Sequence, residues 1–358
     1  MKRYGNKDWD AAKQRWAAYW SGSKTDRPVA VIFAWDDPNR KPPPFKSLEQ
    51  KYTDIEYLRT AAERQLENTH CLGENFATVR LNLGPVCLAR VFGSQPGYGD
   101  TTIWHNEIAG SVPDALALMT ADPSAVDRRL DDMMGLFSFF DRIGLDSLDA
   151  LPACPDLGGP VDTVMQLVGS SQFCADIVSE PDACVSAIDI SAARYNQAAK
   201  RLVERLGPRS SDWLNLYCDD GYFTIGEDIS AMISPRMVRR FVVPALNKAL
   251  DGVSPNVVFH WHSGAMKTLD AFLEMDAVSV LQWTSDINHM LNPPSTHLDE
   301  IRKIMDAGKK LFVYIEPDEI PAFAAAFPAE NIAFGFNAKR PEDGEKIIRQ
   351  LESAYKRD

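Results

Sequence analysis

Two histidines stand one residue apart at the end of an apolar run, in "NVVFHWHSG" (256–264). Side chains two residues apart on a strand share a face, and their Cβ atoms lie roughly 6–7 Å apart. That spacing lets the imidazoles of His260 and His262 converge on one divalent metal ion, for which we expect zinc. In the alternative interpretation one histidine packs against the wall of the fold and the other hydrogen-bonds a substrate.

A metal held by two histidines needs a third protein ligand. Our first choice is Glu316 in "LFVYIEPDE", which also follows an apolar run. Before Pro317, however, the same glutamate is equally typical of a helix start. Asp219 and Asp220, in "LYCDDG", are candidate catalytic acids that protonate a leaving group, although Asp-Asp-Gly is also a favourable turn.

Short apolar runs alternate with helical patterns along the chain. The predicted strands are 29–35, 76–84, 149–160 and 212–221, followed by four in the C-terminal third that include 256–262, 277–283, 311–315 and 331–337. Strand–helix alternation implies a parallel sheet, and eight strands favour a single (β/α)8 TIM barrel. We therefore predict one domain over 1–358, with an N-terminal helical segment at 1–28. An open doubly wound sheet is the rival architecture, but no G-x-G-x-x-G follows the first strand.

Catalytic groups of such barrels lie at the carboxyl ends of the strands. Applied to the predicted strands, this rule puts the two histidines, Glu316, Asp219 and Asp220 around one opening. It adds a set of predicted substrate-binding residues from several strands: Trp35, Asp36, Asp156, Tyr222, Trp283 and Asn337.

The chain has 358 residues and a net charge of −12, which argues against nucleic acid or an anionic membrane surface as a partner. No apolar run approaches the roughly 18 residues of a membrane span. The polar start has no signal-peptide core, so we expect a cytoplasmic protein. The six cysteines form no C-x-x-C pair, which favours free thiols in a reducing compartment.

Three stretches carry a resemblance to a known family. "LYCDDGYFTIGEDISAMISPRMVRRFVVPAL", followed by "VVFHWHSGAMKTLDAFLEMDAVSVLQW", resembles the uroporphyrinogen decarboxylase superfamily, in which an Asp-Asp-Gly strand end precedes a Ser-Pro-started helix and then a His-containing strand end. "GPVDTVMQLVGSSQFCADIVSEPDACVSAI" fits the same pattern. The resemblance covers most of 75–350, and it implies a TIM barrel with either decarboxylase or corrinoid-dependent methyltransferase activity.

The resemblance separates these two activities. The decarboxylases hold substrate carboxylates with N-terminal arginines, whereas here "VAVIFAWDDPNR" offers Arg40 alone. The thiol-activating methyltransferases bind zinc through a His-x-Cys pair and a later cysteine. His260-x-His262 occupies the place of that pair, but no cysteine follows Cys218, so a thiolate-rich site is absent.

The chain looks closest to members that resemble demethylases of methylamines, betaines and methoxy compounds. It has no Asp-x-His-x-x-Gly motif, so the corrinoid would arrive on a separate protein. We therefore predict transfer of a methyl group from a small O- or N-methylated donor to that corrinoid. A metal-dependent lyase, hydrolase or decarboxylase is the alternative, and a non-catalytic small-molecule binder is the third hypothesis. A homodimer is consistent with the sequence.

Overall fold

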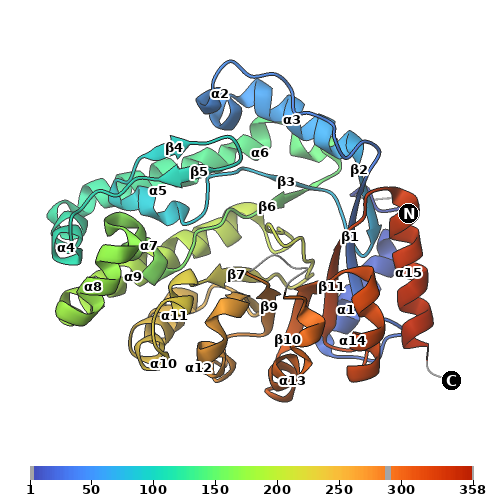
Figure 1. Ribbon diagram of the computed structural model, residues 1–358. Helices are drawn as coiled ribbons and strands as arrows, with labels where there is room; N and C mark the ends of the chain where they lie inside the picture. Colours follow the sequence, from blue (N-terminus) through green and yellow to red (C-terminus); the bar gives the residue numbers. More distant parts are fainter. Residues whose placement is uncertain (1–3, 287–291, 357–358) are drawn as a thin grey trace.

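A computed structural model describes residues 4–286 and 292–356 (Figure 1). Its main sheet has seven strands in the order β2-β1-β11-β10-β9-β8-β7. All neighbours in this sheet are parallel except β2, which runs antiparallel to β1. The strands are β1 (Val29–Trp35), β2 (Thr69–Gly73), β7 (Phe223–Gly226), β8 (Val257–His262), β9 (Val280–Thr284), β10 (Lys310–Tyr314) and β11 (Ile332–Asn337).

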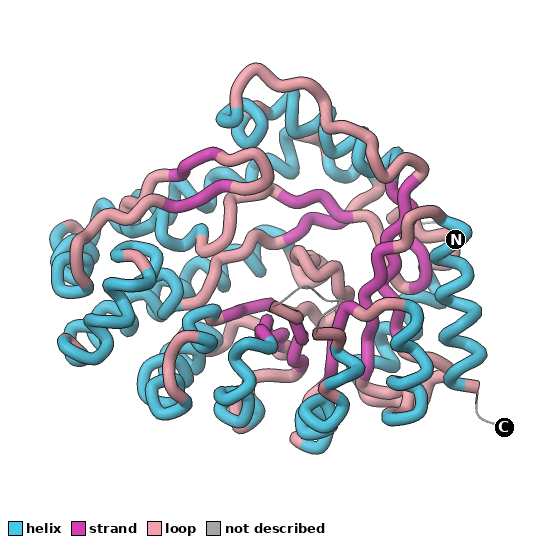
Figure 2. Tube along the Cα trace, in the orientation of Figure 1, coloured by secondary structure: helices cyan, strands magenta, loops and turns pink. Residues whose placement is uncertain are grey.

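Two smaller sheets accompany the main one (Figure 2). β3 (Thr78–Arg80) pairs in parallel with β6 (Leu151–Ala153), and β4 (Pro96–Tyr98) pairs antiparallel with β5 (Ile103–His105). Within the described residues no ladder joins β3 or β6 to the main sheet. The mixed α/β class with a parallel sheet is therefore confirmed, while closure into a (β/α)8 barrel stays a prediction.

Helices follow most of the strands, as the alternating pattern predicts. They are α1 (Trp9–Ser21), α2 (Leu48–Thr53), α3 (Ile55–Asn68), α4 (Val112–Ala121), α5 (Pro123–Gly135), α6 (Phe139–Arg142), α7 (Pro160–Val168), α8 (Ser170–Ser179), α9 (Pro181–Leu206), α10 (Pro235–Met237), α11 (Val243–Leu250), α12 (Leu269–Leu273), α13 (Leu298–Asp306), α14 (Ile320–Ala326) and α15 (Pro341–Tyr355). Within the described residues, none of them is long and apolar enough to cross a membrane.

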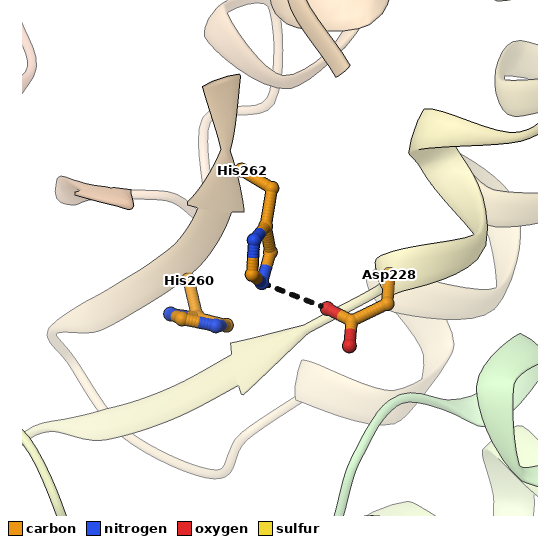
Figure 3. Close-up of side chains that lie close together, drawn as sticks. All are labelled: Asp228, His260 and His262. Atoms are coloured by element: carbon orange, nitrogen blue, oxygen red, sulfur yellow. Dashed lines mark ion pairs between the residues drawn. The ribbon is translucent and has the colours of Figure 1, made fainter. Parts of the chain in front are cut away.

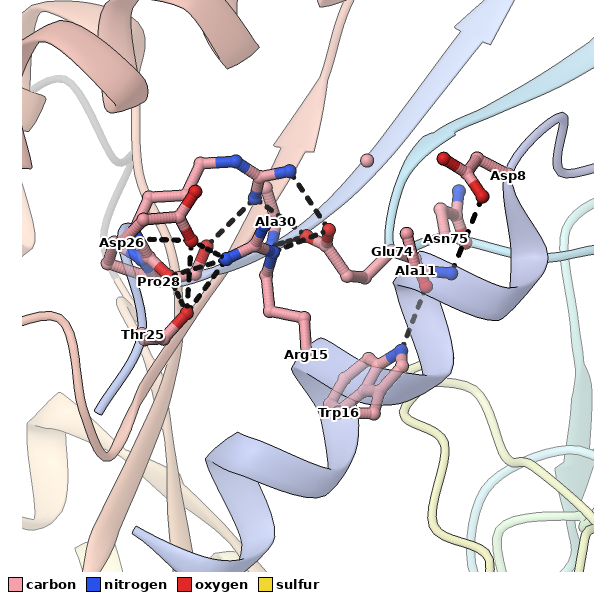
Figure 4. A network of polar contacts seen from close by, with 12 residues as sticks. Asp8, Ala11, Arg15, Trp16, Thr25, Asp26, Pro28, Ala30, Glu74 and Asn75 are labelled. Atoms are coloured by element: carbon pink, nitrogen blue, oxygen red, sulfur yellow. Dashed lines mark hydrogen bonds and ion pairs between the residues drawn. The ribbon is translucent and has the colours of Figure 1, made fainter. Parts of the chain in front are cut away.

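The N-terminal helix α1 is fixed to the edge of the main sheet through buried Glu74 (Figure 4). The Glu74 carboxylate accepts two hydrogen bonds from the Arg27 guanidinium, at 2.8 and 2.9 Å, and one from Arg15 Nε at 3.0 Å. Trp16 Nε1 donates to the Glu74 carbonyl oxygen at 2.9 Å. Bidentate arginine–carboxylate pairs impose a fixed geometry, so this network holds α1 against β1.

The two faces of the main sheet pack against different partners. One face carries Val258, Val280, Phe312 and Ala333, which cluster with Trp9 and Trp16 of α1. We call it the inner face. The outer face packs against the helices that follow the strands and carries Phe259, Leu281, Val313 and Phe334. Because side chains alternate along a strand, His260 and His262 share the inner face with Val258.

The predicted strand over 212–221 is wrong, because that segment is irregular and the strand begins only at Phe223. Asn215 interrupts it with a φ of 62°, in the left-handed region and far from the extended backbone of a regular strand. Trp20 of α1 also donates its Nε1 proton to the Tyr217 carbonyl oxygen at 2.6 Å, so a backbone group that a ladder would use is bound elsewhere. The strand end therefore moves from Asp219–Asp220 to Gly226, directly before Glu227 and Asp228.

Candidate metal centre

Three side chains converge where β7 and β8 end (Figure 3). One ligand atom each from Asp228, His260 and His262 lies within 4.8 Å of the other two. The parallel register pairs Gly226 with His260, which brings Asp228 beside the end of β8. Gly226 also leaves room for the His260 ring, since a Cβ there would lie 3.2 Å from His260 Cδ2. The two imidazoles lie on the same face of β8, with ring centroids 4.7 Å apart.

Each histidine ring is held in its orientation by a hydrogen-bond partner at its Nδ1 atom. His260 Nδ1 hydrogen-bonds Gln282 Oε1, and His262 Nδ1 contacts Asp286 Oδ1. Gln282 Nε2 donates to the Trp283 carbonyl oxygen at 2.9 Å, so its Oε1 is left to accept the Nδ1 proton of His260. Metal-binding histidines use such a partner to fix ring and tautomer. The Nε2 atoms remain for a ligand, with His262 Nε2 3.3 Å from Asp228 Oδ1.

Without a metal, His262 carries a proton between two carboxylates. Its hydrogen bond to Asp228, reinforced by Asp286, raises the pKa of His262 to about 9, and the same contact lowers the pKa of Asp228. Burial lowers the pKa of His260, which is therefore neutral. A divalent cation would take the place of the His262 proton, because a metal ligand must be deprotonated.

The metal-free protein is expected to lose stability as pH rises from about 6.5 through about 9. The folded-state pKa of His262 is raised above its ordinary value, so its contribution is complete at low pH and lost once the imidazolium deprotonates. The free energy of unfolding should fall by at most about 3 kcal/mol. Urea denaturation in the presence of a chelator measures it. His262→Gln should remove most of this pH dependence, and an unchanged dependence would contradict the assignment.

A pair of buried carboxylates fixes the backbone at Asp228. Glu227 accepts hydrogen bonds from the amides of Val161 and Asp162 at 3.0 and 2.9 Å, at the start of α7. Asp162 accepts in return from the amides of Asp228 and Ile229 at 2.6 and 3.0 Å. Burial raises the pKa of both acids, that of Asp162 to about 8. These reciprocal bonds tie the end of β7 to the N-terminus of α7 and position Asp228.

Gly159→Ala is expected to destabilise this junction. A Cβ at Gly159 would lie 2.2 Å from Glu227 Cδ and 2.3 Å from the Gly226 carbonyl oxygen, so backbone must move. We expect a loss of about 1–3 kcal/mol in the free energy of unfolding. The control is Gly135→Ala, whose Cβ would meet nothing within 4 Å. Equal urea midpoints for the two variants would contradict the close packing at Gly159.

The structure does not bring Glu316 to the histidines. Glu316 is exposed and precedes the short 3-10 helix Pro317–Glu319, where its amide donates to Glu319 Oε2 at 2.8 Å. It lines a cavity of about 320 Å³ beside α15, together with Asn337. The helix-start interpretation thus describes Glu316, and Asp228 is the carboxylate beside the two histidines.

The predicted acids Asp219 and Asp220 lie before β7, at its amino end, whereas His262 ends the parallel strand β8. Asp219 accepts a hydrogen bond from the Tyr217 hydroxyl at 2.7 Å. Tyr222, also before β7, is buried in the inner-face cluster and donates to Asp212 at 2.9 Å. The wrong strand register explains all three placements, because it assigned residues before a strand to its carboxyl end.

Trp283 lies on the outer face, 1% exposed, against Trp261 and His297. Its prediction as a pocket residue is therefore wrong by one position, since the neighbouring Gln282 points inward to His260. Trp35 lines a separate cavity of about 280 Å³ together with Arg40 and Arg64.

Two predicted residues at the ends of β1 and β6 differ in their relation to the centre. Asp36 is exposed and hydrogen-bonds His70 at 2.7 Å. Asp156 is half-buried and accepts from the Gly158 amide at 2.7 Å. Burial and, to a smaller extent, the charge of Asp228 raise the pKa of Asp156 to about 6. Asp156 is thus the predicted substrate-binding residue that interacts electrostatically with the metal-ligand group.

Sequence reasoning missed Asp228, Asp286 and Gln282. Asp228 stands in "FTIGEDIS", directly after the buried run that forms β7, so placing the strand on that run would have found it. Gln282 and Asp286 belong to "LQWTSD", where a strand of the same bounds points Gln282 and Trp283 to opposite faces.

Of three comparisons with known proteins, the one with solved structures finds a match, and that match shows the fold alone. No family model matches the chain, and no curated protein matches its sequence. Among solved structures, the chain is similar to a methyltransferase from Methanosarcina mazei, with a TM-score of 0.57 and 15% sequence identity. The match covers 96% of this chain and 98% of that one, so the two proteins share an overall fold.

Proposed function

We propose that the protein is a metal-dependent methyltransferase that moves a methyl group from a small O- or N-methylated donor to a corrinoid on a separate protein. The observation that carries the proposal is the group of Asp228, His260 and His262, with both histidines oriented through Nδ1. The fold shared with a methyltransferase supports it, as does the resemblance of the sequence to the uroporphyrinogen decarboxylase superfamily. A closed (β/α)8 barrel, with β3 and β6 between β1 and β7, is part of this proposal.

The donor set fits a divalent metal such as zinc. Two imidazoles and a carboxylate donate less electron density to the ion than thiolates do. The bound ion would therefore act as a strong Lewis acid toward the oxygen or nitrogen that carries the methyl group. Gln282 and Asp286 would hold the imidazoles in place, and Asp228 would complete the protein ligands. In this role Asp228 replaces Glu316.

Removing a methyl group from oxygen or nitrogen leaves an alkoxide or amine, which is a poor leaving group unless it receives a proton. We assign the proton donor to Asp156 in place of Asp219 or Asp220. Asp156 follows β6, its pKa is raised to about 6, and its charge interacts with that of Asp228. An acid with this pKa is still partly protonated near neutral pH and gives up its proton readily.

A metal-dependent hydrolase, lyase or decarboxylase is the second candidate. The observation in its favour is the donor set itself, because two histidines and one carboxylate also bind the zinc of several hydrolases. In that case Asp156 would transfer protons to and from a substrate that undergoes bond cleavage at the same centre.

Single-turnover methylation of cob(I)alamin separates the two candidates. Zinc-loaded protein would be mixed with cob(I)alamin and with methoxyaromatics, methylamines or betaines, and methylcobalamin followed by its visible spectrum. We expect methylcobalamin from at least one donor class, and none with His262→Ala. If no donor gives methylcobalamin while a metal-dependent hydrolysis or decarboxylation product appears, the second candidate is correct.

A further inference from the structure

Arg80 is the last residue of β3 and points to the same side of the fold as the histidines. Its neighbour Val79 packs in the outer core, so Thr78 and Arg80 face the opposite way. Thr78 Oγ1 donates to Asn215 Oδ1 at 2.8 Å, and Asn215 Nδ2 donates to the Phe76 carbonyl oxygen at 2.8 Å. Phe76 belongs to the inner-face cluster with Val258. Arg80 therefore faces the inner side.

Arg80 ends β3 next to the strand that leads to Asp156, because the parallel register pairs Arg80 with Ala153 of β6. The side chain is exposed to solvent, yet desolvation by the surrounding protein lowers the pKa of its guanidinium. The negative charges of Asp156 and Asp212 act on the pKa of the Arg80 guanidinium in the opposite direction and raise it.

Arg80 makes no hydrogen bond or ion pair within residues 4–286 and 292–356. Asp212 is engaged by neutral donors instead: the Tyr222 hydroxyl at 2.9 Å, the Leu214 amide at 2.8 Å and the Thr224 hydroxyl. Asp156 accepts from the Gly158 amide. The guanidinium is thus a permanent positive charge that is exposed and has no hydrogen-bond or ion-pair partner among the described residues.

The ends of the other parallel strands carry no comparable charge. In the described part of the chain β1, β6, β7, β9, β10 and β11 end in neutral residues and β8 ends in His262, so β3 alone ends in a permanent cation. A planar guanidinium binds a carboxylate through two parallel hydrogen bonds, which fixes orientation as well as charge.

We propose that Arg80 binds a carboxylate group of the substrate, so that the natural methyl donor is a carboxylic acid. That this carboxylic acid is a methyl donor rests on the proposed methyltransferase function, whereas carboxylate binding by Arg80 does not. A substrate held at β3 by its carboxylate would extend past Asp156 toward the histidines that end β8. Arg80 is accordingly a substrate-positioning residue that sets specificity.

Direct binding, without turnover, tests the proposal. Zinc-loaded protein is titrated by calorimetry with four carboxylates and their neutral or cationic counterparts: acetate and acetamide, benzoate and benzamide, 4-methoxybenzoate and 4-methoxybenzamide, betaine and choline. We expect at least one carboxylate to bind about 10- to 100-fold more tightly than its counterpart, the size of a charge-assisted hydrogen-bond pair. Arg80→Gln should abolish this preference, and Arg80→Lys should restore part of it.

The matched control is Arg209→Gln, which removes an arginine that is 61% exposed beside Asp219 and should leave the preference unchanged. Thermal melts and zinc content establish that each variant is folded and loaded. A preference that survives in Arg80→Gln overturns the proposal, as does the absence of any carboxylate preference in the wild type. Carboxylate preference without methyl transfer would leave the role of Arg80 intact and count against the methyltransferase function alone.

Discussion

Zinc is expected to bind the purified protein at about one ion per chain, and His262→Ala is expected to bind it more than about 100-fold more weakly. This 100-fold limit is conservative, because even substituting a residue that hydrogen-bonds a metal ligand lowers the metal affinity about 10- to 100-fold. His260→Ala should have a similar effect, since both imidazoles come from one strand and face Asp228. Competition with a chromophoric chelator at neutral pH measures the affinities.

Two further measurements distinguish a preorganised metal site from nonspecific binding of zinc to histidines. Gln282→Leu, which removes the acceptor behind His260, should weaken zinc binding about 10- to 100-fold without removing a ligand. Zinc binding near pH 7 should release about one proton, because the pKa of His262 is raised to about 9 in the metal-free protein. The control is His70→Ala, which removes a histidine paired with Asp36 and should leave affinity unchanged. Wild-type affinity in His262→Ala would rule out the centre.

Asp156→Asn is expected to lower kcat about 10²- to 10⁴-fold with any donor whose leaving group needs a proton. The amide keeps the size of the carboxyl group and cannot give up a proton to the leaving group. Because the acid form is the active one and the pKa of Asp156 is raised to about 6, wild-type kcat should fall as pH rises through about 6. The variant should lose this limb of the profile while it keeps its zinc.

Asp219→Asn is the comparison that decides between the two proposed acids. Asp219 lies at the amino end of β7, where its carboxylate accepts from Tyr217, so this variant should retain kcat and its pH profile. If Asp219→Asn loses activity and Asp156→Asn does not, the acid is where the sequence pattern alone first placed it. The kinetics are single-turnover formation of methylcobalamin, which isolates the chemical step.

Local patterns sufficed for much of the architecture. The alternation of apolar runs with helical periodicity predicted the parallel strands β8 to β11. The two-residue repeat of a strand also put His260 and His262 on one face, as the structure has them. Such features depend on residues that are close together in the sequence, so they can be predicted from the sequence alone.

Contacts between distant residues decided the rest of the centre. The segment 212–221 is as apolar as a strand, but a bond from Trp20 to Tyr217, 197 positions away, and the left-handed Asn215 keep it irregular. The strand therefore lies at Phe223–Gly226, so that Asp228 and not Asp219 follows its carboxyl end. Gln282 and Asp286 meet the histidines only because β9 lies beside β8. Strand register and inter-strand order arise from packing across the whole sheet, and no local periodicity encodes which carboxylate will face which imidazole.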